Sequence, residues 1–265
     1  MYSKWQLAGK YLKYYFNSSN GKGHGVHSPF VFQFITKVLN NKQHYPAYDK
    51  VEKLRDQLLK DHSYLTIEDF GAGSVSNKTN NRTIASIANN AAKPKKFGQL
   101  LFRIVKEYQP ATILELGTSL GITTSYFALA KPTAGILTME GAVEVANIAR
   151  ENFGKLELKN ISIVQGNFDK SLVTSISELS TIDFVFIDGN HRREPTERYF
   201  MELLNKVNND SIFVFDDIHW SFEMEAAWET IKQHPDVTCT IDLFFIGIVI
   251  FRKEILEKQH FTIRF

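Results

Sequence analysis

The sequence predicts an α/β fold, in which a doubly wound, mostly parallel sheet of seven strands follows an N-terminal helical region. Apolar segments alternate with helical patterns after about residue 93. Two of these segments, "IDFVFID" (182–188) and "SIFVFDD" (211–217), are as apolar as strands that are covered on both faces. The last two apolar segments, 237–243 and 244–253, abut with little room for a helix, which indicates an antiparallel hairpin at one edge.

Residues 1–92 are expected to form the helical region. Ser28 can cap a helix that begins at Pro29, and 48–61 has the pattern of a second amphipathic helix. Two glycine-rich loops, "GKGHGVHSPF" (21–30) and "DFGAGS" (69–74), interrupt these helices. The three glycines of the first loop indicate backbone freedom or close approach to a ligand, with an ordinary helix entry as the alternative, and the second loop is equally ambiguous. The histidines of the first loop lack partners for a zinc site.

Residues 93–265 carry the alternating elements of a single ligand-binding domain. The expected elements, in order, are helix 96–108, strand 112–116, helix 123–130, strand 135–140, helix 143–155, strand 161–166, strand 182–188, helix 194–207, strand 211–217, helix 222–234 and the terminal hairpin. Sheets of this type bind ligands outside the carboxyl ends of their strands. The candidate functional residues therefore are those that follow the strands.

The composition excludes several classes of protein. The chain has 265 residues with 43% hydrophobic and 23% charged residues, which is ordinary for a soluble globular protein. A net charge of +2 is too small to indicate a nucleic-acid or membrane partner, and the single cysteine excludes an intramolecular disulfide. The N-terminus lacks the apolar segment of a signal peptide, and the longest apolar run, 243–251, is too short to span a bilayer. We expect a soluble, cytoplasmic protein, and a homodimer remains open.

A glycine turn follows the first strand of the expected sheet. In "LELGTSLG" (114–121), Glu115 lies near the strand end and is followed by Gly117 and Gly121. Such a turn lets backbone amides and a helix N-terminus face a ligand. Ser119 stands where the dinucleotide fingerprint needs its second glycine, which argues against NAD and FAD. An ordinary strand-to-helix turn remains the alternative.

The next two strand ends add residues suited to a nucleoside. Glu140 ends the second strand, where an acidic side chain can accept hydrogen bonds from a ribose diol. Gly166 and Asn167 end the third strand, where an adenine edge can rest.

This order of motifs resembles the class I S-adenosylmethionine-dependent methyltransferases over roughly residues 95–253, and it implies their Rossmann-like sheet. "FGQLLFRIVKEYQPATILELGTSLG" and "GILTME" are similar to the catechol and caffeoyl-CoA branch of the metal-dependent O-methyltransferases. The resemblance implies Glu140 at the ribose, Gly117 and Ser119 at the methionine moiety, and Asn167 and Phe168 near the adenine. The full set that it implies for the cofactor is Glu115, Gly117, Thr118, Ser119, Gly121, Glu140, Gly141, Asn167, Phe168 and Asp188. In the metal-dependent O-methyltransferases the N-terminal helices often lie over the cofactor and substrate, so the resemblance also implies that the loop 21–30 can act as a lid.

Three aspartates follow the fourth and fifth strands. Asp188 ends the fourth strand, and Asp216 and Asp217 end the fifth. If the two strands are parallel neighbours, the three carboxylates meet at one edge of the sheet, where Mg²⁺ is the natural counter-charge. Three alternatives stay open: Asp217 as a helix cap, Asp188 as a turn cap, and salt bridges to Arg192 or Arg193.

The resemblance extends to these aspartates. Metal-dependent O-methyltransferases place one Asp after the fourth strand and an Asp-Asn or Asp-Asp pair after the fifth. The Asp-Asp form is similar to the macrolide-sugar branch, in which a His two residues after the pair acts as the base, and His219 holds that position. His191 holds the position of the catalytic Lys of the catechol branch. His219 and His191 are therefore the candidate bases, with a non-catalytic role as the alternative for both.

Together these features predict an O-methyltransferase that binds S-adenosylmethionine and uses a divalent cation to activate a hydroxyl of a small-molecule substrate. Two other functions remain open. One is a metal-independent methyltransferase acting on nitrogen or a small acid, and the other is a non-catalytic module that only binds S-adenosylmethionine.

Overall fold

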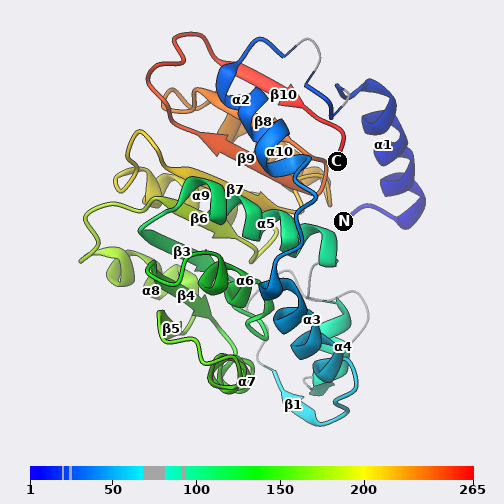
Figure 1. Ribbon diagram of the computed structural model, residues 1–265, viewed down its shortest axis with the longest axis vertical. Helices are drawn as coiled ribbons and strands as arrows, with labels where there is room; N and C mark the ends of the chain where they lie inside the picture. Colours follow the sequence, from blue (N-terminus) through cyan, green and yellow to red (C-terminus); the bar gives the residue numbers. More distant parts are fainter. Residues whose placement is uncertain (20, 24–25, 68–80, 91–93) are drawn as a thin grey trace. The chain divides into compact units, whose positions relative to one another are not determined.

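The computed structural model describes residues 1–265 except 20, 24–25, 68–80 and 91–93 (Figure 1). The described residues have the expected α/β class, and their main sheet is mostly parallel with eight strands, one more than expected. The chain divides into two compact units, which differ from the regions expected on either side of residue 92. Unit 1 contains residues 1–41 and 179–265, and unit 2 contains residues 42–178.

Unit 2 contains three parallel strands in the order β3-β4-β5, drawn in green in Figure 1. In the register of these strands, Leu116 pairs with Met139, and Glu140 pairs with Gln165. All three carboxyl ends therefore lie at one edge. The strands and helices of this part are α5 (Lys95–Tyr108), β3 (Thr112–Leu116), α6 (Ile122–Ala130), β4 (Gly135–Glu140), α7 (Val143–Lys155), β5 (Ile161–Gln165) and α8 (Phe168–Ile176).

Two glycines let these helices pack closely. A Cβ atom on Gly98 of α5 would lie 2.6 Å from a ring atom of Tyr126 on α6. Gly121, which precedes α6, has a φ of 78°, and a Cβ there would lie 2.5 Å from the ring of Phe153 on α7. Backbone conformation and close packing thus both require glycine at position 121.

The first part of unit 2 agrees only partly with the sequence prediction. The helix expected over 48–61 is present as α3 (Pro46–Leu58), with Pro46 in its first turn. A short antiparallel pair, β1 (Tyr64–Thr66) and β2 (Asn81–Thr83), and helix α4 (Ile84–Asn90) were not predicted. The loop 69–74 lies outside the described residues.

Unit 1 contains five strands in the order β10-β8-β9-β7-β6. The parallel pair β6–β7 and the antiparallel pair β8–β9 were predicted, but β10, which lies parallel to β8, was not. The elements are β6 (Phe184–Ile187), α9 (Arg193–Leu204), β7 (Ile212–Asp216), α10 (Phe222–Gln233), β8 (Cys239–Asp242), β9 (Ile246–Ile250) and β10 (Gln259–Thr262).

The N-terminal helices belong to unit 1. Ser28 occupies the N-cap position of α2 (Pro29–Gln33), as expected, but its side chain makes no capping hydrogen bond. This helix continues as the π-helix η1 (Phe34–Leu39). Helix α1 (Lys4–Asn17) was not predicted, although Ser3 and Gln6 form a capping box at its start. Tyr14 of α1 is buried, and its hydroxyl donates to the carbonyl of Ile263. No helix in the described part of the chain is long and apolar enough to cross a membrane.

Candidate active site

The glycine turn after β3 folds onto the end of β4. Gly117 has a φ of 106° and Ser119 a φ of 48°. The amides of Gly117 and Thr118 both donate to the carbonyl of Met139 at 3.0 Å. The turn therefore leads directly from β3 into α6 and holds its backbone beside Glu140.

Glu140 ties this turn together. Its Oε2 atom accepts from the amide of Ser119 at 2.8 Å, and its Oε1 atom accepts from the amide of Ala142, beyond Gly141, at 2.9 Å. These two bonds hold the carboxylate between the glycine turn and the residues that lead into α7. Glu140 is half-buried at the strand edge, which suits the expected contact with ribose hydroxyls.

Glu115 is fully buried near the end of β3. Its Oε2 atom accepts from the hydroxyls of Thr124 and Thr138. Burial raises the pKa of this carboxyl to about 8, although the two hydroxyls act in the opposite direction. Its Oε1 atom is buried without a hydrogen-bond partner in the described structure. A carboxyl with this pKa is mostly protonated near neutral pH, and because Oε2 already accepts two hydrogen bonds, the proton belongs on Oε1.

The end of β5 contains a helix cap that the sequence prediction missed. Gly166 has a φ of 142°, and Asn167 accepts from the amide of Asp169 at 2.9 Å to cap α8. Phe168, the first residue of this helix, is half-buried. Asn followed by an amphipathic segment is the signal that would have identified α8.

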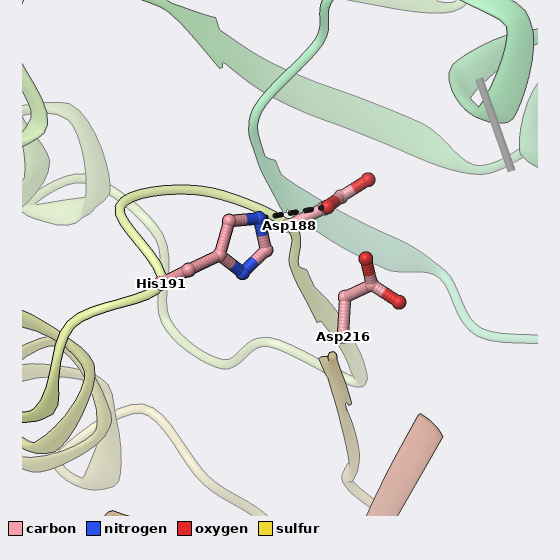
Figure 2. A group of neighbouring side chains, drawn as sticks. All are labelled: Asp188, His191 and Asp216. Carbon is pink, nitrogen blue, oxygen red and sulfur yellow. Dashed lines mark ion pairs between the residues drawn. The ribbon is translucent and has the colours of Figure 1, made fainter. Parts of the chain in front are cut away.

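A carboxylate pair lies at the ends of β6 and β7 in unit 1. Asp188 follows β6, and Asp216, which is 1% exposed, is the last residue of β7. Because these strands are parallel neighbours, the two aspartates lie together, as the sequence predicted. His191 joins them from the loop after Asp188 (Figure 2).

The geometry of this group suits a cation. One potential ligand atom from each of Asp188, His191 and Asp216 lies within 4.8 Å of the others. The Nε2 atom of His191 is 3.6 Å from Oδ1 of Asp188, and the ring of Trp220 meets the imidazole edge-on at 5.6 Å. Two carboxylates suit Mg²⁺ or Mn²⁺. His191 could be a third ligand, which would shift the preference toward transition metals, or a base beside the cation.

Asp217 is not a member of this three-residue group. It has a φ of 52°, and its amide donates to the carbonyl of Phe245 at 2.7 Å. Its carbonyl accepts from the amide of Trp220, so its backbone shapes the turn after β7. Ser221, rather than Asp217, caps α10, and the helix-cap interpretation of Asp217 is therefore wrong.

The two arginines proposed as counter-charges have other partners. The Nε atom of Arg192 donates to Asn190 at 2.7 Å, and Arg193 forms an ion pair with Glu197 at 2.8 Å. The residues that gather at the carboxyl ends of β6 and β7 are therefore the two aspartates and His191, whereas both arginines contact other residues.

His219 has a different environment from His191. Its Nδ1 atom lies 3.0 Å from Oε1 of Glu225, and its Nε2 atom lies 2.8 Å from Oδ2 of Asp242. Burial alone would lower the pKa of His219, but the hydrogen bonds and charges of Asp242 and Glu225 outweigh burial and raise it. A ring that bridges two carboxylates in this way is stabilised as the imidazolium, which has no lone pair with which to accept a proton.

The sequence prediction missed the network around Glu225. This carboxylate accepts from the hydroxyl of Tyr2 at 2.6 Å and from Nζ of Lys10 at 2.9 Å, in addition to its contact with His219. The amide of Tyr2 donates to the carbonyl of Trp220 at 3.1 Å. These contacts attach the N-terminal segment to the turn that follows β7.

Comparisons with known proteins show the family of this chain. Residues 114–218 match the family described as "Methyltransferase domain". The tRNA (guanine-N(7)-)-methyltransferase of Mycoplasma mobile is 30% identical over 143 residues, which cover 48% of this chain and 71% of that protein. Mouse catechol O-methyltransferase is 28% identical over 127 residues, which cover 46% of this chain and less than half, 47%, of the mouse enzyme.

Solved structures give the same fold. The O-methyltransferase from Bacillus cereus, solved in complex with S-adenosylhomocysteine, superposes with a TM-score of 0.55 and 19% identity, and the match covers 83% of this chain and 97% of that one. The matched domain, the related sequences, the fold and the glycine turn with Glu140 together show that this chain belongs to the class I S-adenosylmethionine-dependent methyltransferases.

Proposed function

We propose that the protein is an O-methyltransferase that acts on a hydroxyl of a small molecule and requires a divalent cation. The observation that carries this proposal is the group of Asp188, Asp216 and His191 at the ends of two parallel strands. The similarity to mouse catechol O-methyltransferase supports oxygen as the acceptor atom.

In this proposal the cofactor lies against the strand ends of unit 2. Glu140 accepts hydrogen bonds from the ribose hydroxyls while it keeps the amides of Ser119 and Ala142 in place. The backbone from Gly117 to Ser119 faces the methionine moiety, and the buried carboxyl of Glu115 supports this region by accepting from the hydroxyls of Thr124 and Thr138. Phe168 offers an apolar surface to the adenine.

Asp188 and Asp216 would hold the cation, which when bound lowers the pKa of a coordinated hydroxyl. We assign the general base to His191, because His219 is held between two carboxylates. His191 accepts the hydroxyl proton, and its ring lies edge-on to that of Trp220. Asp217 supports the turn and supplies no ligand in this assignment.

The reaction is a displacement at the methyl carbon. The substrate oxygen forms a bond to that carbon while the sulfonium–carbon bond breaks. The products are a methyl ether, S-adenosylhomocysteine and a proton held by His191. Positioning the two reactants can contribute on the order of 7–11 kcal/mol to the rate enhancement.

A turnover assay on a panel of vicinal diols and catechols tests this function. Formation of S-adenosylhomocysteine and of a methylated product would be measured with Mg²⁺, with Mn²⁺ and with neither. We expect turnover of at least one diol or catechol that depends on the cation. Cofactor binding without any methylated product would support a module that only binds S-adenosylmethionine.

The similarity to the Mycoplasma mobile tRNA methyltransferase favours one alternative, a metal-independent transfer to a ring nitrogen. That alternative predicts methylation of guanine in tRNA that continues in excess chelator. Methylated nucleosides from a tRNA substrate, separated by chromatography, distinguish it from the O-methyltransferase proposal.

A further inference from the structure

The N-terminal 48 residues carry an unusual charge distribution. This segment contains six lysines (4, 10, 13, 22, 37 and 42) and neither Asp nor Glu, since the first acidic residue is Asp49. The whole chain has a net charge of +2, so the remaining residues sum to −4, because 2 − 6 = −4. The positive charge is therefore concentrated in the segment that contains α1, although the total charge is small.

Helix α1 exposes a stripe of large apolar side chains. Trp5, Leu12 and Phe16 are 89%, 56% and 75% exposed. Their spacing of seven and four residues places them on one face of the helix. Gly9 falls on the same face, and a Cβ there would meet nothing within 4 Å. Three large apolar side chains aligned on one helix face mark an interaction site rather than scattered surface residues.

The opposite face of α1 is anchored to unit 1. Lys10 forms an ion pair with Glu225, and the rings of Tyr11 and Tyr14 lie 5.1 and 5.3 Å from that of Phe244. The apolar stripe therefore points away from the packed face, and the helix holds it in a fixed position on unit 1.

Lysines flank the apolar stripe. Lys4 and Lys13 are exposed, and at 100° per residue they fall on opposite sides of the line through Trp5, Leu12 and Phe16. A helix with a central apolar stripe, basic flanks and no acidic residue is the type that lies in the interface of a negatively charged bilayer. We propose that α1 binds the surface of an anionic lipid membrane, with the stripe inserted among the acyl chains and the two lysines at the headgroups.

The charges of α1 favour a membrane over two other partners for this helix face, a second copy of the chain and a nucleic acid. A symmetric contact with a second copy would bring basic flanks toward basic flanks, and the helix has no acidic residue to compensate them. A nucleic acid would pair with the lysines but would leave Leu12 and Phe16 without an apolar partner. An anionic bilayer satisfies both the lysines and the stripe.

Vesicle sedimentation with the full chain tests this proposal. The probes are vesicles of phosphatidylcholine alone and of phosphatidylcholine mixed with phosphatidylglycerol. We expect binding to the anionic vesicles and little to the neutral ones. L12S/F16S should weaken binding at least tenfold, and K4Q/K13Q should weaken it by about fivefold per lysine.

Matched controls separate the helix from general surface properties. V173S/L256S removes two exposed apolar side chains outside α1, and K50Q/K53Q removes two exposed lysines from α3. Both controls should bind anionic vesicles as the unchanged protein does, and far-ultraviolet circular dichroism would verify that all variants are folded. Absence of binding to anionic vesicles would overturn the proposal, as would equal losses in the controls. Loss of a dimer or of tRNA binding in L12S/F16S, with vesicle binding unchanged, would instead assign the stripe to a second copy or to RNA.

Discussion

The Nε2 atom of His219 lies 2.8 Å from the Oδ2 atom of Asp242, and the other ring nitrogen faces Glu225. His219 therefore has a structural role, because it connects α10 with β8, whereas His191 lies beside Asp188. The two candidate bases can therefore be separated by mutation.

H191Q should reduce kcat by about 10²–10⁴-fold, which is the usual contribution of a general base. H219Q should keep turnover within about tenfold, but it should lower the melting temperature, because it leaves Asp242 without its cationic partner and Glu225 with Lys10 as its remaining cationic partner. Kinetics and thermal melting of both variants would be compared at one pH. A large kcat loss in H219Q with an unchanged melting temperature would return the base assignment to His219.

Asp188 and Asp216 should be required for stabilisation by a divalent cation. In D188N or D216N, the rise in melting temperature caused by Mn²⁺ or Mg²⁺ should disappear, because each variant removes one of the two carboxylates. D217N is the matched control, since Asp217 is the adjacent acid outside the group. If D217N alone abolished the rise in melting temperature, the cation would be bound by Asp217 and not by Asp188 and Asp216.

Glu140 should determine cofactor affinity. E140Q should weaken S-adenosylhomocysteine binding by roughly tenfold to a hundredfold, corresponding to about 1–3 kcal/mol, because its amide group cannot accept all the hydrogen bonds that the carboxylate accepts. Calorimetric titration measures this change. E151Q, which changes an exposed acid on α7, is the control. Equal affinity in E140Q and E151Q would remove Glu140 from the cofactor site.

Glu115 should make stability decrease with increasing pH. Its pKa is raised from 4.5 to about 8 in the folded protein, so the folded state retains a proton that the unfolded chain releases within this range. The stabilisation is complete below pH 4.5 and is lost as pH rises toward 8. Denaturant unfolding should show the free energy of unfolding falling across this window, relative to E115Q, by an amount on the order of a few kcal/mol. If the free energies of unfolding of the unchanged protein and of E115Q changed with pH in parallel, Glu115 would not retain its proton in the folded state.

The sequence predicted the elements whose signals are local. Apolar runs identified β6 and β7, and their parallel pairing made it possible to predict that Asp188 and Asp216 lie together. The glycine turn and Glu140 could also be placed from the sequence, because the turn directly follows β3 and Glu140 is the last residue of β4. Helix α1 was missed even though its capping box is visible in the sequence. Its packing depends on a long-range contact, the hydrogen bond from Tyr14 to Ile263 near the C-terminus.

The environment of His219 could not be predicted in this way. Its partners Glu225 and Asp242 belong to α10 and β8, and only the tertiary packing brings both to one ring. The same holds for the ion pair between Lys10 and Glu225, whose residues lie at opposite ends of the sequence. Long-range polar contacts of this kind leave no periodic pattern.

The most direct test of the account is methyl transfer with and without a divalent cation. Labelled S-adenosylmethionine and a reactive diol or catechol from the substrate panel would be incubated after exhaustive chelation and again after addition of Mg²⁺ or Mn²⁺, with unchanged protein and with D216N. We predict no transfer after chelation, full recovery with the cation in the unchanged protein, and no recovery in D216N. Transfer to oxygen that persists at the same rate in chelator would contradict the role assigned to Asp188 and Asp216.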